Sequence, residues 1–244
     1  MSEFKKYNIR QFEKYISALS VSRRISLIQL HHTYSPSYKQ FTGNNHIALQ
    51  TGMRSYHIKY NGWSDIGQHF SIFPDGMIVT GRSVEMIPAG IKGANTGAIC
   101  IECVGNFDAG GDIMSDAQKE SIVSVVKILL DKFSLQPENA VIYHSWWNAS
   151  GKKLGDYIKG KSAKTCPGTN FFGGSSRNAF ETNLLPLIST GEKDSSVKQE
   201  IKNIAEILSA AGIITDMELW QKKCADDTNV YWLCRKTADY VKTK

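Results

Sequence analysis

The stretch that decides the fold is Ile25-Ser-Leu-Ile-Gln-Leu-His31-His32-Thr33. Its mostly apolar residues lead directly into two histidines and then into Ser35-Pro36, a dipeptide typical of a turn. This pattern predicts a short buried strand that delivers imidazole side chains to the end of a sheet. A strand packed on both faces holds such a side chain rigidly, as a metal ligand requires. Because both faces of the strand are apolar, these residues alone leave the choice between His31 and His32 open.

Helical and strand patterns alternate along the chain on both sides of this stretch. Apolar residues at helical spacing predict helices, and short apolar runs bounded by turn residues predict strands. Pro74-Asp75-Gly76 lies between two apolar runs and predicts a β-hairpin. Ser115 and Gln118 resemble a capping box before the longest helix. The expected helices cover residues 8–19, 46–56, 112–135 and 176–189. The hairpin is expected within 62–82, and the other expected strands lie at 96–104 and 141–144.

The strand around residues 98–104 contains a carboxylate and two thiols. Glu102 stands among Ile, Cys and Val, where an unpaired charge is costly to bury. Cys100 and Cys103 have the C-x-x-C spacing of some metal and redox pairs. Positions three apart in a strand face opposite sides of the sheet, so we interpret both as core thiols.

Composition narrows the classes of function. The 244 residues carry a net charge of +6 and the sequence pI is near 9.0, which favours polyanionic partners. The basic residues are scattered and no nucleic-acid-binding motif is present, so we expect no nucleic-acid partner and instead consider wall polymers. No apolar run approaches the ~20 residues of a membrane span. We also expect no signal peptide and, from the odd count of five cysteines, no disulfide framework.

Three places along the chain offer ligands for a soft cation. They are His31 or His32, His144 at the end of its strand, and Cys166 in Lys164-Thr-Cys-Pro-Gly168. Two imidazoles and one thiolate make a suitable zinc set that leaves a fourth position free. The charge of Lys164 is expected to lower the pKa of the Cys166 thiol. Dispersed histidines and a cysteine can equally be core residues, and the residues alone do not decide between the two.

Several spaced motifs give the chain a resemblance over roughly residues 20–190. In order, they are Leu-His31-His32-Thr, Gly62-Trp-Ser-Asp-Ile-Gly, Phe-Pro-Asp75-Gly-Met-Ile-Val-Thr-Gly-Arg82, Ile-Glu102-Cys-Val-Gly105, His144 and Lys164-Thr-Cys166-Pro-Gly. This series resembles the zinc-dependent N-acetylmuramoyl-L-alanine amidases, the family of phage endolysins and peptidoglycan recognition proteins. The resemblance implies an α/β fold with a central mixed sheet flanked by helices.

The same resemblance implies a set of site residues. It implies one Zn²⁺ held by His31, His144 and Cys166, with peptidoglycan as the substrate. Many members have a tyrosine where this chain has Gln68, so the resemblance moves the role of base to Glu102. Lys164 would stabilise the oxyanion, and Thr165 and Gln68 would contact substrate. Cys166 follows His144 by 22 positions, a longer insertion than in many members, and Trp146 or Trp147 in it would either stack on substrate or pack the loop down.

Domain boundaries and biology are expectations of the same kind. We predict a catalytic domain over 1–190, a linker over 191–196 and a small helical module over 197–244, which would bind the wall or join chains into a homo-oligomer. The expected function is an endolysin, made in a host cytoplasm, that cleaves between N-acetylmuramic acid and L-alanine after release to the wall. The alternatives are a peptidoglycan-binding protein without catalysis and a zinc-stabilised structural protein.

Overall fold

A six-stranded mixed sheet forms the centre of the fold in the computed structural model, which describes residues 3–189, 193–226, 234, 237–238 and 241. The strand order is β1-β4-β3-β5-β2-β6. β1 and β4, and β4 and β3, pair antiparallel, whereas β3, β5, β2 and β6 run parallel to one another. The strands are β1 (Lys6–Tyr7), β2 (Leu27–His32), β3 (Phe70–Ile72), β4 (Ile78–Thr80), β5 (Ala98–Cys103) and β6 (Val141–Tyr143). This confirms the predicted α/β class with a mixed sheet.

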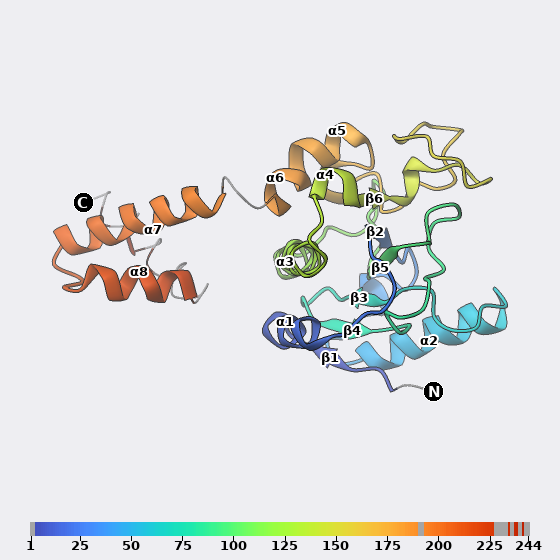
Figure 1. Cartoon of the computed structure of the whole chain (residues 1–244), viewed down its shortest axis with the longest axis horizontal. Coiled ribbons are helices and arrows are strands. Elements are labelled where there is room, and N and C mark those ends of the chain that lie inside the picture. The colour runs from blue at the N-terminus through green and yellow to red at the C-terminus, as the bar shows by residue number, and fades with distance from the viewer. Residues whose placement is uncertain (1–2, 190–192, 227–233, 235–236, 239–240, 242–244) are drawn as a thin grey trace. The chain divides into compact units, whose positions relative to one another are not determined.

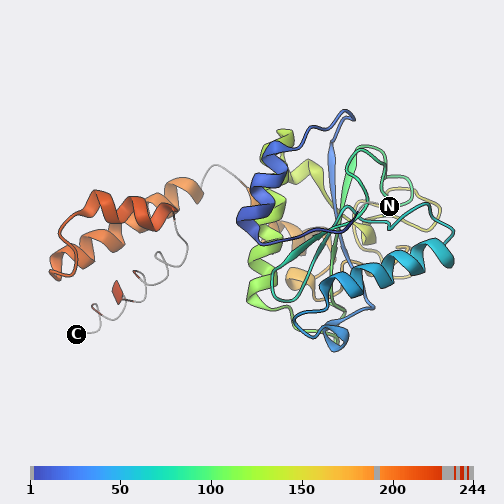
Figure 2. The same ribbon diagram turned by 90° about the horizontal axis from the view of Figure 1, so that it is seen from below.

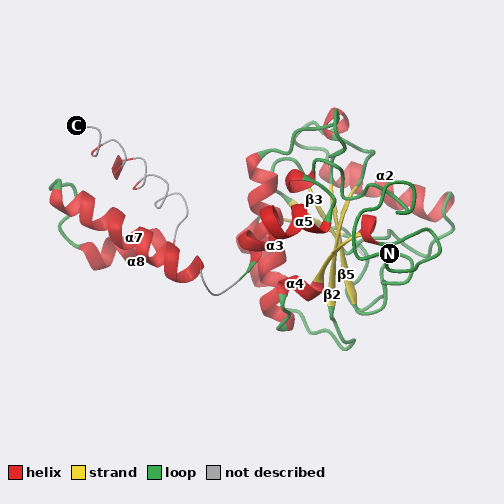
Figure 3. Ribbon diagram, turned by 90° about the horizontal axis from the view of Figure 1, so that it is seen from above, coloured by secondary structure: helices red, strands yellow, loops and turns green. Residues whose placement is uncertain are grey.

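Helices cover both faces of the sheet (Figure 1). The longer ones in the unit that holds the sheet are α1 (Ile9–Ala18), α2 (His46–Lys59) and α3 (Asp116–Phe133). Two further helices, α7 (Lys193–Ala210) and α8 (Met217–Asp226), belong to a second unit. Shorter segments are η1 (Tyr38–Gln40), α4 (Pro137–Ala140), η2 (His144–Trp146), η3 (Phe171–Gly173), α5 (Arg177–Ala179), η4 (Phe180–Leu184) and α6 (Leu185–Ile188). Helices α1 and α3 lie side by side on one face, and α2 lies on the other (Figures 2 and 3).

The register of β2 and β5 sorts their side chains between these two faces. Ile28, Leu30 and their partners Ile99 and Ile101 are fully buried in the main core cluster, which also contains the apolar stripe of α3. Because side chains alternate along a strand, Gln29 and His31 face the opposite side, toward α2. His31 is paired with Glu102 in the parallel ladder, so both side chains lie on that same face.

Most predicted elements are present, with one correction. The hairpin and the helices over 8–19 and 46–56 are confirmed. The buried side of α2 carries the polar residues His46 and Gln50 beside Met53, whereas Ile47 and Tyr56 are exposed. Ser115 caps α3 by accepting from the Gln118 backbone N–H, as predicted. The other half of the capping box is wrong, because the Gln118 amide instead donates to the carbonyls of Ile72 and Val104.

The chain divides into two compact units, residues 1–188 and 189–244. In the second unit α7 and α8 pack around a separate core cluster that includes Ile201, Ile204 and Leu208. The linker predicted over 191–196 is helical from Lys193 onward, because α7 begins there. The last part of the helical module predicted over 197–244, from residue 227 onward, lies largely outside the described residues. Within the described part of the chain, no helix has the length and apolarity that crossing a bilayer requires.

Candidate metal and catalytic site

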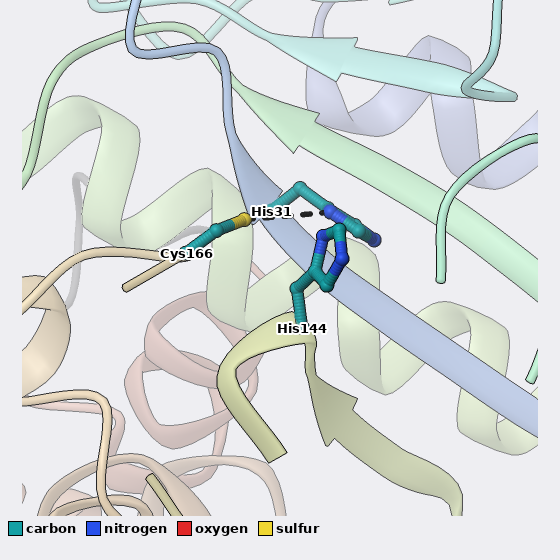
Figure 4. Close-up of side chains that lie close together, drawn as sticks. All are labelled: His31, His144 and Cys166. Atoms are coloured by element: carbon teal, nitrogen blue, oxygen red, sulfur yellow. Dashed lines mark hydrogen bonds between the residues drawn. The ribbon is translucent and has the colours of Figure 1, made fainter. Parts of the chain in front are cut away.

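Three predicted ligands meet at the carboxyl end of the parallel strands. Leu30 of β2 is paired with Tyr143 of β6, so the next residues, His31 and His144, are neighbours, with ring centroids 5.1 Å apart. The backbone carbonyl of Cys166 accepts from the Ser145 N–H at 2.7 Å, which brings the thiol to the same place. The ligand atoms of His31, His144 and Cys166 all lie within 4.8 Å of one another (Figure 4). The resemblance implied that these three residues share a metal, but their spacing along the chain does not by itself show that they meet.

Hydrogen bonds orient the His31 ring. Its Nδ1 lies 3.4 Å from Cys166 Sγ, and its Nε2 lies 3.2 Å from the side-chain oxygen of Gln29. His32 points to the other side, where its Nδ1 accepts from the Phe107 backbone N–H at 3.1 Å. The structure therefore selects His31 over His32. Gln29 was missed in the sequence, although a polar residue two positions before a histidine in a strand shares its face.

Burial keeps the two histidines of the cluster neutral. Burial, together with His144 and Lys164, lowers the pKa of His31 well below its usual value, and burial lowers the pKa of His144 to about 4. Neutral imidazole is the form that binds metal. Burial also raises the pKa of the Cys166 thiol well above its usual value, although Lys164 acts in the opposite direction. Lys164 therefore lowers the pKa of the thiol as expected, but burial outweighs that charge and the net shift is upward.

A neighbouring loop holds the turn that carries Cys166. The carboxylate of Asp108 accepts from the Thr165 hydroxyl and from the Thr169 backbone N–H, both at 3.0 Å. Thr169 in turn accepts from the Ala109 N–H at 2.8 Å. The two loops are thus joined on either side of the cysteine. No feature of the sequence near Asp108 indicated this role.

Glu102 supplies an acid beside the cluster. Its Oε2 is buried and has no hydrogen-bond partner among the described residues. Burial raises the pKa of this carboxyl to about 8, while Lys164 acts in the opposite direction. This agrees with the position of Glu102 in an apolar strand, where a charge is costly to bury.

An open pocket of about 920 Å³ connects these groups to solvent. The three candidate ligands and Glu102 lie in its wall, and residues of α2 form one side of it. Exposed or partly exposed aromatic side chains at the pocket include Tyr34, Tyr56 and Trp63. The pocket therefore offers both a polar centre and a long apolar wall.

The remaining predicted site residues divide into two groups. Lys164, Thr165 and Gln68 line the pocket. The Gln68 amide donates to Ser71 Oγ at 3.0 Å, and its buried Oε1 has no partner in the described part of the chain. Trp146 and Trp147 are only 1% and 6% exposed and belong to the main core cluster, so the suggestion that they stack on substrate is wrong.

Comparison with known proteins agrees with this geometry. A family model described as N-acetylmuramoyl-L-alanine amidase matches residues 21–169. The chain belongs to this family. The matched region of this amidase-family chain contains all three candidate ligands and Glu102.

Individual relatives and structures are more distant. The endolysin of Enterobacteria phage K11 is 27% identical over 92 residues, which is 38% of this chain and 60% of the relative. The endolysin of Escherichia phage T7 is 34% identical over 84 residues, 33% of this chain and 55% of the relative. The matches thus span somewhat more than half of these relatives. The structure of Drosophila peptidoglycan recognition protein SA has a TM-score of 0.51 at 20% identity, covering 68% of this chain and 83% of that chain, and shows the same fold.

Proposed function

We propose that this chain is a zinc-dependent peptidoglycan hydrolase. It cleaves the amide between the lactyl group of N-acetylmuramic acid and the L-alanine of the stem peptide. The observation that carries the proposal is the meeting of His31, His144 and Cys166 beside Glu102 in one open pocket. Endolysins among the relatives support a role in which the protein reaches the wall after release from a host cell.

The donor set fits zinc. The 3.4 Å between Cys166 Sγ and His31 Nδ1 is close to the edge of a zinc tetrahedron, about 3.5 Å for bonds of about 2.0–2.3 Å. Two nitrogens and one sulfur would leave one position of a four-coordinate zinc for water or substrate, as in catalytic rather than structural zinc sites. When bound, zinc supplies Lewis acidity that polarises the scissile carbonyl and makes water acidic enough to attack near neutral pH.

The residues of this chain perform the proton transfers and hold the charges. Glu102 Oε2 accepts a proton from the attacking water and returns it to the leaving amine of L-alanine. The exposed Lys164 ammonium stabilises the negative charge that develops on the carbonyl oxygen. The Thr165 hydroxyl donates to Asp108 and keeps a lone pair for a substrate N–H. The unpartnered Oε1 of Gln68 provides a second acceptor for substrate.

The wall of the pocket suits the rest of the substrate. Tyr56 and Trp63 lie in it, and each presents an aromatic ring that can cover an apolar face of sugar or peptide. Tyr56 is 57% exposed, so its ring is accessible to a substrate in the pocket. Recognition without cleavage is the less favoured function, because the cysteine and the acid needed for hydrolysis are both in place.

Wall digestion tests the proposal. Purified protein is expected to hold about one zinc per chain and to free alanine amino groups from cell walls without new reducing sugar ends. Cys166→Ser removes one of three ligands, so we expect zinc affinity and hydrolysis to fall at least 100-fold. Cys103→Ser, at a buried thiol outside the cluster, is the control and should keep the zinc. New reducing ends, or a Cys166→Ser variant with full activity, would contradict the proposed reaction.

A further inference from the structure

Gln29 lies behind His31, on the side away from the pocket centre. Its side chain is fully buried, and its Nε2 donates to the Ala94 carbonyl at 2.8 Å. A carbonyl oxygen only accepts, so this bond fixes which end of the amide is the nitrogen. The amide oxygen of Gln29 is therefore the atom that lies 3.2 Å from His31 Nε2.

This arrangement determines the tautomer of His31. An amide oxygen cannot donate, so Nε2 must carry the hydrogen and the lone pair is on Nδ1. That nitrogen is the one that faces Cys166 Sγ. We propose that Gln29 is a positioning residue that holds His31 as the Nε2–H tautomer, with Nδ1 ready to bind the metal. The inference rests on the metal site of the proposed function and adds to it a specific residue behind the ligand.

The surroundings of Gln29 leave it little freedom. Asn95 Oδ1 accepts from the Gly90 backbone N–H at 3.0 Å and lies 3.4 Å from Gln29 Nε2. Gly90 lies so close to the contact between Gln29 and His31 that a Cβ there would be 2.1 Å from Gln29 Oε1 and 3.1 Å from His31 Nε2. Groups behind a ligating histidine typically change metal affinity by about 10–100-fold when they are removed. Because its surroundings hold Gln29 in one position, its amide oxygen can fix the orientation of the His31 ring.

Zinc affinity of the full chain, measured by competition with a chromogenic chelator, tests the inference. Gln29→Leu keeps the volume but loses the acceptor, and we expect affinity to fall about 10–100-fold. Gln50→Leu is the matched control, because Gln50 is also fully buried and its Nε2 donates to one backbone carbonyl, that of Thr80. It is expected to cost stability but to leave zinc affinity within about threefold. In Gly90→Ala the added Cβ would push the Gln29 side chain away from His31, so we expect zinc affinity to fall as it does in Gln29→Leu.

Nitrogen chemical shifts of the histidines in the metal-free protein give a readout that needs neither zinc nor activity. We expect His31 as the Nε2–H tautomer in the wild-type chain and a mixture of tautomers in Gln29→Leu. Wild-type zinc affinity in Gln29→Leu, or His31 as the Nδ1–H tautomer in the wild type, would overturn the inference. A wild-type chain that binds no zinc would instead contradict the proposed function, and the tautomer measurement would still decide the role of Gln29.

Discussion

At the scale of single residues, Glu102 makes the stability of the folded chain depend on pH. Its carboxyl has a pKa of about 8 in the folded chain against 4.5 as a reference, so between these values the folded state holds a proton that the unfolded state releases. The free energy of unfolding should therefore fall as the pH rises from about 4.5 through 8. Glu102→Gln stays neutral throughout, so the metal-free variant should be the more stable protein at pH 9. The difference is expected to reach up to about 5 kcal/mol, since each pKa unit between 4.5 and about 8 corresponds to about 1.4 kcal/mol. Denaturant titrations at pH 5 and pH 9 measure this, with the exposed Glu120→Gln as the control, and a difference independent of pH would contradict it.

At the scale of elements, the turn over residues 164–169 depends on Asp108 in the loop beside it. Asp108→Ala removes the acceptor for Thr165 and Thr169, so we expect a loss of about 1–3 kcal/mol in the free energy of unfolding and weaker zinc binding through Cys166. Denaturant titration and chelator competition measure the two effects. The control is Asp116→Ala, whose side chain is 92% exposed, and it should change either quantity little. Zinc affinity that is equal in Asp108→Ala and the wild type would show that the turn holds Cys166 without this carboxylate.

At the scale of the whole molecule, the two units have separate cores. Every buried member of the main cluster lies between Phe12 and Ile188, and the second cluster begins at Ile201. A fragment of residues 1–188 is therefore expected to fold, bind zinc and hydrolyse a soluble muropeptide at a rate within about threefold of the full chain. Circular dichroism, zinc content and product analysis measure these properties, and an unfolded fragment would contradict the expectation. If residues 189–244 bind the wall, the fragment alone should lose activity on insoluble walls. If they instead join chains, the full chain should be oligomeric in solution and the fragment monomeric.

The sequence predicted where the helices and strands lie better than it predicted which side of each is buried. Helix α2 was expected from its spacing, yet the side of it that packs carries His46 and Gln50, because a tightly fitted polar side chain can be buried when it finds a partner. Trp146 stands in a polar insertion and gave no sign of its burial. In the structure its ring packs against Phe180 and its indole N–H donates to the Ser175 carbonyl at 2.9 Å. Such contacts join distant segments, and hydrophobic spacing along the chain does not encode them.

The sequence by itself determined the kinds of groups available: a strand that ends in imidazole, a carboxylate in an apolar strand, and a cysteine in a tight turn. These follow from local pattern, because neighbours along the chain decide periodicity and turn formation. Only the tertiary structure decided that His31 rather than His32 lies next to His144 and Cys166, and that Gln29 stands behind His31. Which face of a strand meets which partner depends on the register of β2 between β5 and β6, and that register is fixed by packing between segments that are tens to more than a hundred residues apart.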